Sequence, residues 1–218
     1  MIEMKTFRTR EEWLEARTSY IGGSDASSVI GNNPYRSNVE LWLQKTGRAQ
    51  KADISEKPYV RYGTDAEEPL RKLFELDYPK FEVGYAENNI WLNDEYPWAH
   101  ASLDGWLTEK ETGRKGILEI KTSNILQSIQ KEKWKDQIPD NYYAQVLHYM
   151  AVTGFDFVIL KAQLKYDYGD GKIFLNTMHY QIERTECEED IAYLMQEEEK
   201  FYQYILKDKE PPLVFGIV

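Results

Sequence analysis

Cysteine is almost absent from this sequence, which contains Cys187 and no other thiol. A single cysteine excludes disulfide bonds within the chain and any zinc site built from several cysteines. We expect Cys187 to be a free thiol near a helix start. Histidine is also scarce: His100, His148 and His179 are scattered and indicate no metal triad. No signal peptide and no apolar run long enough to span a membrane is visible, so we expect a soluble, cytoplasmic protein.

Positive charge is in short supply, because 27 lysines and arginines face 37 aspartates and glutamates, for a formal net charge of −10. This balance excludes a generally basic coat for nucleic acid. It leaves room for a local basic groove, or for a site that gathers carboxylates around a cation. With 218 residues, 42% of them hydrophobic and 14% aromatic, the chain suits a single folded domain over 1–218.

Hydrophobic periodicity and turn residues divide the chain into helices and strands. Capping residues and glycines bound the helices that we predict at 9–18, 24–31, 38–46, 63–76, 140–153 and 186–208. Alternation predicts strands at 81–92, 96–107, 116–124, 155–166 and 172–183, and the polar segment 48–58 is expected to be a loop. Helices and strands in this order predict an α/β fold, with a mixed central sheet and helices on its faces.

The segment GILEIKTSN, residues 116–124, carries a carboxylate and an ammonium inside an apolar strand. A period of two places Glu119 and Lys121 on one face and Leu118 and Ile120 on the other. A lone Glu-x-Lys of this kind is usually a solvated ion pair on the outer face of a strand, where it contributes little stability. Other residues must therefore decide whether this pair belongs to a site.

Asp104 lies on the preceding predicted strand. If the loop at 110–116 forms a symmetric hairpin, facing positions sum to 223, so Asp104 lies opposite Glu119. Like charges that face each other are unfavourable, so a cation is expected between them, and two carboxylates with water suit magnesium. Lys121 would then hold a water or neutralise a developing oxyanion. A register slip of one residue would separate these groups.

Two predicted helices carry further polar residues that would join such a site. Glu67 and Glu68 lie on the helix at 63–76, and Gln145 and Tyr149 share one face of the helix at 140–153. Gln145 lies among apolar neighbours and therefore needs a hydrogen-bond partner. Tyr149 is equally well explained as an aromatic residue of the core or its rim.

In order along the chain, the candidate site residues are Glu67, Asp104, Glu119-Ile120-Lys121 and Gln145-x3-Tyr149. This order resembles the PD-(D/E)XK nuclease superfamily, although Leu103 stands where that motif has proline. Three N-terminal blocks are more specific, namely WLEARTSYIGGSDASSVIG (13–31), LWLQKTG (41–47) and GTDAE (63–67). With them the chain resembles the phage-type recombination exonucleases, the group of YqaJ and bacteriophage lambda exonuclease, over about residues 13–154.

The resemblance implies a single nuclease domain with a restriction-endonuclease-like fold, which divides into three parts along the chain. Residues 1–62 would form an N-terminal helical part that binds the DNA end, and 63–154 the catalytic core. Residues 155–218 would supply the remaining strands and a C-terminal helix.

The resemblance also implies a metal site. Asp104, Glu119 and the backbone carbonyl of Ile120 would bind Mg2+, or Mn2+ in its place, and two ions are expected. Glu67 would complete the metal shell, directly or through water, with the adjacent Glu68 as its rival.

Catalytic and orienting roles follow from the same resemblance. Lys121 would activate or orient the attacking water, and Gln145 would orient either the lysine or that water. Tyr149 is a further candidate on the face that carries Gln145.

A 5′-phosphate site is implied as well, formed by Arg17, Ser24 and Ser102. A guanidinium and hydroxyls near a helix N-terminus suit a phosphate. Without the resemblance, Arg17 is a surface residue of an amphipathic helix and Ser24 a helix N-cap. An additional arginine expected soon after the Glu-x-Lys strand is missing from SNILQSIQ. The next segment, KEKWKDQ (131–137), either touches the DNA backbone or forms a solvated loop.

For function, the resemblance implies a magnesium-dependent exonuclease that degrades one strand of duplex DNA from its end, 5′ to 3′. It would leave a 3′ single strand for recombination by strand annealing. The alternatives are a restriction-like or structure-specific endonuclease on the same fold, and a non-catalytic DNA-binding module. The intact Asp104, Glu119 and Lys121 argue against the module.

The partners implied by the resemblance are DNA ends, a single-strand annealing protein and further copies of the chain in a homotrimer. No association with a membrane is expected. The apolar tail PPLVFGIV (211–218) either contacts a neighbouring copy or folds back on its own sheet. A bacterial cytoplasm and a phage or prophage origin are expected.

Overall fold

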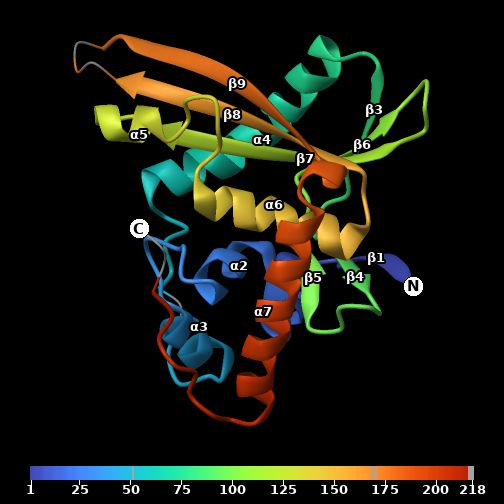
Figure 1. Cartoon of the computed structure of the whole chain (residues 1–218). Coiled ribbons are helices and arrows are strands. Elements are labelled where there is room, and N and C mark those ends of the chain that lie inside the picture. Colours follow the sequence, from blue (N-terminus) through green and yellow to red (C-terminus); the bar gives the residue numbers. More distant parts are fainter. Residues whose placement is uncertain (51, 168, 170, 216–218) are drawn as a thin grey trace.

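The computed structural model describes residues 1–50, 52–167, 169 and 171–215, and its strands form two sheets (Figure 1). The larger sheet has the strand order β3 (Phe81–Gly84), β6 (Gly105–Glu109), β7 (Lys115–Asn124), β8 (Phe157–Asp167) and β9 (Ile173–Glu183). The smaller sheet has the order β1 (Ile2–Thr6), β4 (Asn89–Asn93), β5 (Ala99–Ala101) and β2 (Ile21–Gly22).

The larger sheet is mixed, because β7 and β8 run parallel while its other neighbouring strands are antiparallel. Helices cover both of its faces (Figure 1). Helix α4 (Pro58–Asp77) packs on the face that carries Leu118 and Ile120, and helix α6 (Asp140–Thr153) packs on the face that carries Ile117. The predicted α/β fold with a mixed, helix-flanked sheet is confirmed.

The remaining helices are α1 (Arg10–Thr18), α2 (Gly23–Val29), α3 (Asn38–Lys45), α5 (Ser128–Glu132) and α7 (Glu188–Leu206). A 3-10 turn, η1 (Arg184–Glu186), comes just before α7. Helix α7 packs against α6, α2 and α3 and passes along all three in Figure 1. In the described part of the chain, no helix combines the length and the apolar character that a membrane crossing requires.

Two predicted strands are each divided between the two sheets. Residues 81–92 form β3 in the larger sheet and β4 in the smaller one, and residues 96–107 likewise form β5 and β6. The side-chain amide of Asn89 explains the second break, because its Oδ1 accepts from the Leu103 N–H and its Nδ2 donates to the Leu103 carbonyl, both at 2.9 Å. The amide takes the place of a neighbouring strand at Leu103, so the chain can leave one sheet and enter the other.

Two N-terminal elements also differ from the prediction. Strand β1 was not expected; all its residues are exposed, and it is defined by its pairing with β4. Helix α4 begins at Pro58, inside the segment predicted to be a loop. Proline is favourable at the first position of a helix because its φ angle is already helical and its missing N–H needs no partner there.

The described part of the C-terminal tail contacts helix α3 of the same chain. The Asn38 side chain of α3 donates to the Pro212 carbonyl at 2.8 Å and accepts from the Val214 N–H at 3.0 Å. The expectation that the tail folds back on its own sheet is therefore wrong for these residues, which pack on a helix instead. Phe215 is exposed, and positions 216–218 lie outside the described residues.

A buried ion pair joins three elements of the fold. His148 of α6 contacts Glu198 of α7 through Nδ1 at 2.8 Å and the His100 carbonyl of β5 through Nε2 at 2.9 Å. Both side chains of the pair are fully buried. Burial alone would lower the pKa of His148, but the Glu198 carboxylate and the His100 carbonyl raise it above its usual value. His148 therefore has a structural role, since it ties α6 to α7 and β5.

We expect Glu198→Gln to destabilise the protein by about 3 kcal/mol at pH 5.5, because removing one partner leaves the other buried charge uncompensated. A histidine with a raised folded-state pKa contributes its full stabilisation below its unfolded pKa and loses it as the pH rises through the folded value. The difference in free energy of unfolding should therefore shrink by pH 8.5, as measured by urea denaturation. Glu197→Gln, which breaks the Glu197–Lys200 pair, is the control and should show a small difference at both pH values. An equal loss for Glu198→Gln at the two pH values would contradict the assignment.

Candidate active site

The hairpin of β6 and β7 has the predicted register, with Gly105 opposite Leu118. Asp104 lies immediately before β6, and its Oδ2 accepts a hydrogen bond from the Ile120 N–H at 2.8 Å. The Asp104 carboxylate is thereby held beside the middle of β7, next to Glu119.

Glu119 and Lys121 form a buried ion pair. The Lys121 Nζ lies 2.6 Å from Glu119 Oε1, and the Glu119 side chain is 2% exposed. The explanation of this pair as a solvated surface bridge is therefore wrong. Lys121 also lies 4.8 Å from the centroid of the Tyr142 ring on α6, so the polar face of β7 is covered by that helix.

Gln145 of α6 has the partner that its apolar surroundings require. Its Nε2 lies 2.9 Å from both Glu119 Oε1 and the Tyr149 hydroxyl. The amide therefore donates to the carboxylate, and among the described residues no hydrogen bond joins it to Lys121. Glu119 Oε2 is buried and has no hydrogen-bond partner in the described chain, which leaves one oxygen of this carboxylate available.

These groups line a cleft of about 670 Å³. Its walls come from α1, α4, β7, α6 and the segments 85–89 and 102–104. The lining residues are Arg10, Trp13, Arg17, Thr64, Glu67, Glu68, Arg71, Tyr85, Glu87, Asn88, Asn89, Ser102, Leu103, Asp104, Glu119, Ile120, Lys121, Gln145 and Tyr149.

The two adjacent glutamates of α4 differ in their surroundings. Glu67 is partly buried, and the charges of Asp104 and Lys121 act on it. Glu68 lies at the rim with its side chain 66% exposed, and it pairs with Lys72 at 2.6 Å. Of the two, Glu67 is the one that the fold brings toward Asp104.

The acids of the cleft are held in a poorly solvated and negatively charged environment. Burial and the nearby Asp104 raise the pKa of Glu67 to about 7, and the same two causes raise the pKa of Glu119. Burial also raises the pKa of Asp104, despite the Lys121 ammonium and the Ile120 N–H. Burial alone would lower the pKa of Lys121, but Glu119 and Asp104 raise it above its usual value. Three carboxyls around one ammonium favour a further cation.

The chemistry of this set suits a hard cation with oxygen ligands. In the described part of the chain, no three His, Cys, Asp or Glu side chains converge closely enough to enclose an ion by themselves. A cation held by Asp104 and the free oxygen of Glu119 would therefore keep several waters, which is the usual state of protein-bound magnesium.

Arg71 of α4 is a cleft residue that the sequence did not single out. Its Nη1 donates to the Asp104 carbonyl at 2.6 Å, and its Cζ lies 3.5 Å from the centroid of the Tyr85 ring. Its spacing of four residues from Glu67 on one predicted helix was the available signal. Arg10 also lines the cleft, so cations reach it from α1 and α4 although none follows the Glu-x-Lys strand closely.

Arg17 of α1 is partly buried and held on two sides. Its Cζ lies 4.1 Å from the centroid of the Trp13 ring, and its Nε donates to His100 Nε2 at 3.2 Å. Burial lowers the pKa of Arg17, yet the nearby Tyr149 and Asp25 oppose that shift. The explanation of Arg17 as a freely solvated surface residue does not fit these contacts.

The two serines of the predicted phosphate site lie in different places. Ser102 lines the cleft with Arg17, and its Oγ is buried without a hydrogen-bond partner in the described chain. Ser24 is exposed and lines a second hollow of about 600 Å³, to which Arg17 also contributes. The N-cap prediction for Ser24 is wrong, because Gly22 is the N-cap of α2 and its N–H donates to the Asp25 carboxylate at 3.1 Å.

Two cations of the second hollow are already neutralised. Arg36 Nη2 lies 2.7 Å from Asp25 Oδ1, and Lys45 Nζ lies 2.9 Å from Asp25 Oδ2. Burial alone would raise the pKa of Asp25, but Lys45 and Arg36 hold it well below its usual range. This network stabilises the α2–α3 region and leaves Arg17 as the cation shared with the cleft.

Trp134 lines neither the cleft nor the second hollow. It is 3% exposed, and its ring packs at a tilt against those of Tyr142 and Tyr180. A DNA contact through this aromatic ring is therefore excluded, while the other residues of segment 131–137, its three lysines included, are exposed.

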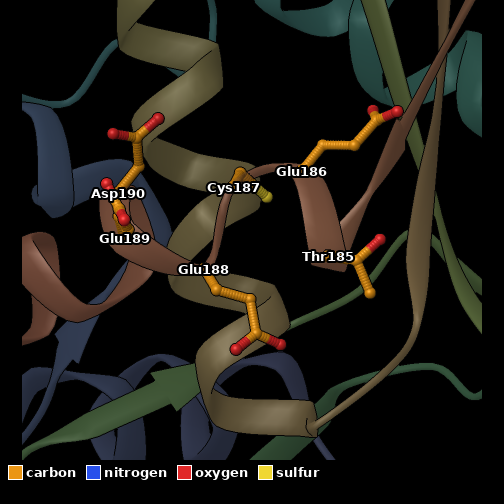
Figure 2. Close-up of a pocket in the computed structure, with 6 residues that line it drawn as sticks. All are labelled: Thr185, Glu186, Cys187, Glu188, Glu189 and Asp190. Atoms are coloured by element: carbon orange, nitrogen blue, oxygen red, sulfur yellow. The ribbon is translucent and has the colours of Figure 1, made fainter.

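The acidic turn Thr185–Asp190 forms a separate hollow, which Figure 2 shows in close-up. The carboxylates of Glu186, Glu188 and Asp190 point in different directions there and do not converge on one point. Cys187 is buried directly before α7, as predicted for a free thiol near a helix start. Burial and Asp190 raise the pKa of Cys187 to about 11, so this thiol is not activated.

Comparison with solved structures places the fold among exonucleases. The chain superposes on an alkaline exonuclease, LHK-Exo, from Laribacter hongkongensis with a TM-score of 0.62 and 20% identity, covering 91% of this chain and 93% of the other. Its complex with dAMP gives a TM-score of 0.63 with the same identity and coverage. A phage-related exonuclease from Haemophilus somnus 129PT gives 0.53 and 16% identity, over 87% and 96% of the two chains.

Sequence comparison identifies the family. Protein YqaJ of Bacillus subtilis (strain 168) is 34% identical over 150 residues, which cover 68% of this chain and 44% of YqaJ. The chain thus spans less than half the length of that relative. Residues 12–156 match the YqaJ-like viral recombinase domain. The chain therefore belongs to the YqaJ-like viral recombinase family.

Proposed function

We propose that the cleft hydrolyses phosphodiester bonds of duplex DNA from an end, 5′ to 3′, and leaves a 3′ single strand for recombination by annealing. The observation that carries the proposal is the buried group of Asp104, Glu119 and Lys121, with a carboxylate oxygen left unpartnered. The family and the fold shared with alkaline exonucleases support it.

The proposed cofactor is Mg2+, two ions with Mn2+ as a substitute, held by Asp104, Glu119 and the Ile120 carbonyl, with Glu67 completing the shell directly or through water. When bound, such ions lower the pKa of a coordinated water and stabilise the charge that develops on the phosphate. Glu119 Oε2 and the three acids with raised pKa values are the features of this chain that suit it.

Lys121 acts, in this proposal, as a fixed cation. Its raised pKa keeps the ammonium protonated, so it orients the attacking water or stabilises the developing oxyanion rather than removing a proton. Gln145 holds the Glu119 carboxylate at 2.9 Å, and Tyr149 fixes the amide in turn. Arg71 holds the backbone of Asp104.

Arg17, Ser102 and Ser24 are proposed to receive the 5′-terminal phosphate, with residues 1–62 as the part that meets the DNA end. The unpartnered Ser102 Oγ, in the cleft that Arg17 also lines, supports a ligand there. A restriction-like or structure-specific endonuclease is the alternative on the same fold, and it would not need this pocket.

Assembly is proposed on physical grounds. A chain with a net charge of −10 is repelled by DNA at long range, and a closed homotrimer would keep DNA threaded without strong attraction. An annealing protein is the proposed recombination partner, because the product strand must be paired.

The proposal is tested with linear duplex labelled at either the 5′ or the 3′ end, and with closed circular duplex of the same sequence. In Mg2+ the 5′ label should be released at once and the 3′ label late, and EDTA should stop both. The closed circle should stay intact because it has no end. Nicking of the circle would favour the endonuclease, and early release of the 3′ label would reverse the polarity.

Asp104→Asn should reduce hydrolysis by about 100-fold or more, the scale expected when a charge-stabilising group is lost. The amide oxygen still accepts from the Ile120 N–H, and removing one of three crowded charges relieves repulsion, so the melting temperature in EDTA should stay the same or rise. Asp65→Asn removes an equal charge from an exposed position of α4 and is the control. Near-normal activity of Asp104→Asn at saturating Mg2+ would disprove the assignment.

Glu67→Gln and Glu68→Gln separate the two rival glutamates. We expect Glu67→Gln to raise the Mg2+ concentration for half-maximal activity by about tenfold or more, because outer contacts to a metal typically matter on this scale. Glu68→Gln should change it by less than about twofold, since its carboxylate pairs with Lys72 at the rim. The reverse ranking in a magnesium titration would assign the role to Glu68.

A further inference from the structure

We propose that His100 is a positioning residue that holds the Arg17 guanidinium ready for the terminal phosphate of a DNA strand. The inference rests on the proposed role of Arg17. It concerns how that arginine is fixed, and it assigns a function to a buried histidine that the reaction itself does not use.

Arg17 is held at its Nε and on its flat face. His100 Nε2 accepts from Nε at 3.2 Å, and the Trp13 ring lies 4.1 Å from Cζ. Trp13 is itself fixed, because its Nε1 donates to the Asn89 carbonyl at 3.0 Å. In the part of the chain that the structure describes, no hydrogen bond engages the two terminal nitrogens of Arg17, and the residue lines both the cleft and the second hollow.

The imidazole of His100 must be neutral to do this. A guanidinium only donates hydrogen bonds, so Nε2 has to present its lone pair and the ring proton lies on Nδ1. His100 Nδ1 is buried and has no partner among the described residues. Leaving a buried donor unpaired is unfavourable, and the bond from Arg17 gives a reason for this tautomer. Burial and the Arg17 charge hold the pKa of His100 well below its usual range.

The ring of His100 is itself fixed by close packing. The backbone carbonyl of His100 accepts a hydrogen bond from His148 Nε2 at 2.9 Å. Gly22 of β2 pairs with His100 of β5 in the smaller sheet. A Cβ atom at position 22 would lie 2.5 Å from His100 Cε1, which explains a glycine there. The guanidinium therefore rests on a rigid support, and phosphate binding need not order a long flexible side chain.

Binding is measured in EDTA by fluorescence anisotropy, with blunt duplexes that carry either a 5′ phosphate or a 5′ hydroxyl. Wild type and His100→Gln, whose amide oxygen replaces the Nε2 acceptor, should prefer the phosphorylated end. His100→Leu should weaken binding of that end by about tenfold and leave the hydroxyl end unchanged. In an Arg17→Ala background, His100→Leu should have no further effect, since residues that act through one another are not additive. His179→Leu, a change at a histidine outside both hollows, is the control.

Several results would overturn the inference. These are an unchanged phosphate preference in folded His100→Leu, an equal loss on both ends, or a further loss in the Arg17→Ala background. If wild type and Arg17→Ala each bound the phosphorylated and the hydroxyl end equally well, Arg17 would have no role in phosphate recognition. The inference would then fail as well. Hydrolysis of the same duplex in Mg2+ tests the proposed function separately. If His100→Leu does not fold, Gly22→Ala displaces the ring and should show the same selective loss.

Discussion

The buried carboxylate of Glu119 is the group on which the rest of the cleft depends. It is 2% exposed, and an ionised carboxylate in such a place is very unfavourable without partners. Lys121 and Gln145 both contact its Oε1, while Oε2 has no partner in the described chain. The need of the buried Glu119 carboxylate for partners explains the Glu-x-Lys pair inside an apolar strand and the lone amide in an apolar helix. It also leaves a place for a cation.

The second sheet matters because it sets the position of Asp104. The Asn89 side chain bonds both backbone groups of Leu103, so residues 102–104 pass between the sheets in an irregular conformation that faces the cleft. Ser102 and Asp104 therefore reach the same cavity from one short segment. Leu103 between them lines the cleft as well, whereas a straight strand would have turned the Leu103 side chain to the face opposite Ser102 and Asp104.

The sequence predicted the parts of this arrangement that local rules govern. The alternation of β7, the hairpin register and the need of Gln145 for a partner follow from a period of two, a symmetric loop and an unsatisfied amide. Other features are nonlocal. The division of two strands between sheets depends on Asn89 meeting Leu103, and the support of Arg17 depends on His100, 83 positions away. Arg71 lay within reach of a local rule, because it follows Glu67 by one helical turn.

Charge is distributed unevenly within the cleft, and this bears on an acidic chain that is proposed to bind DNA. Four cationic side chains line it (Arg10, Arg17, Arg71 and Lys121), against five acidic ones (Glu67, Glu68, Glu87, Asp104 and Glu119). The protein groups alone therefore give a phosphate little net attraction.

A bound divalent cation would reverse that balance. DNA and metal would then each improve the binding of the other, since coupling between two ligands is reciprocal. The arginines at the α1 end would meet the terminal phosphate while the carboxylates beside β7 hold the cation. The separation of the two charges along one cleft would orient the strand with its end toward Arg17.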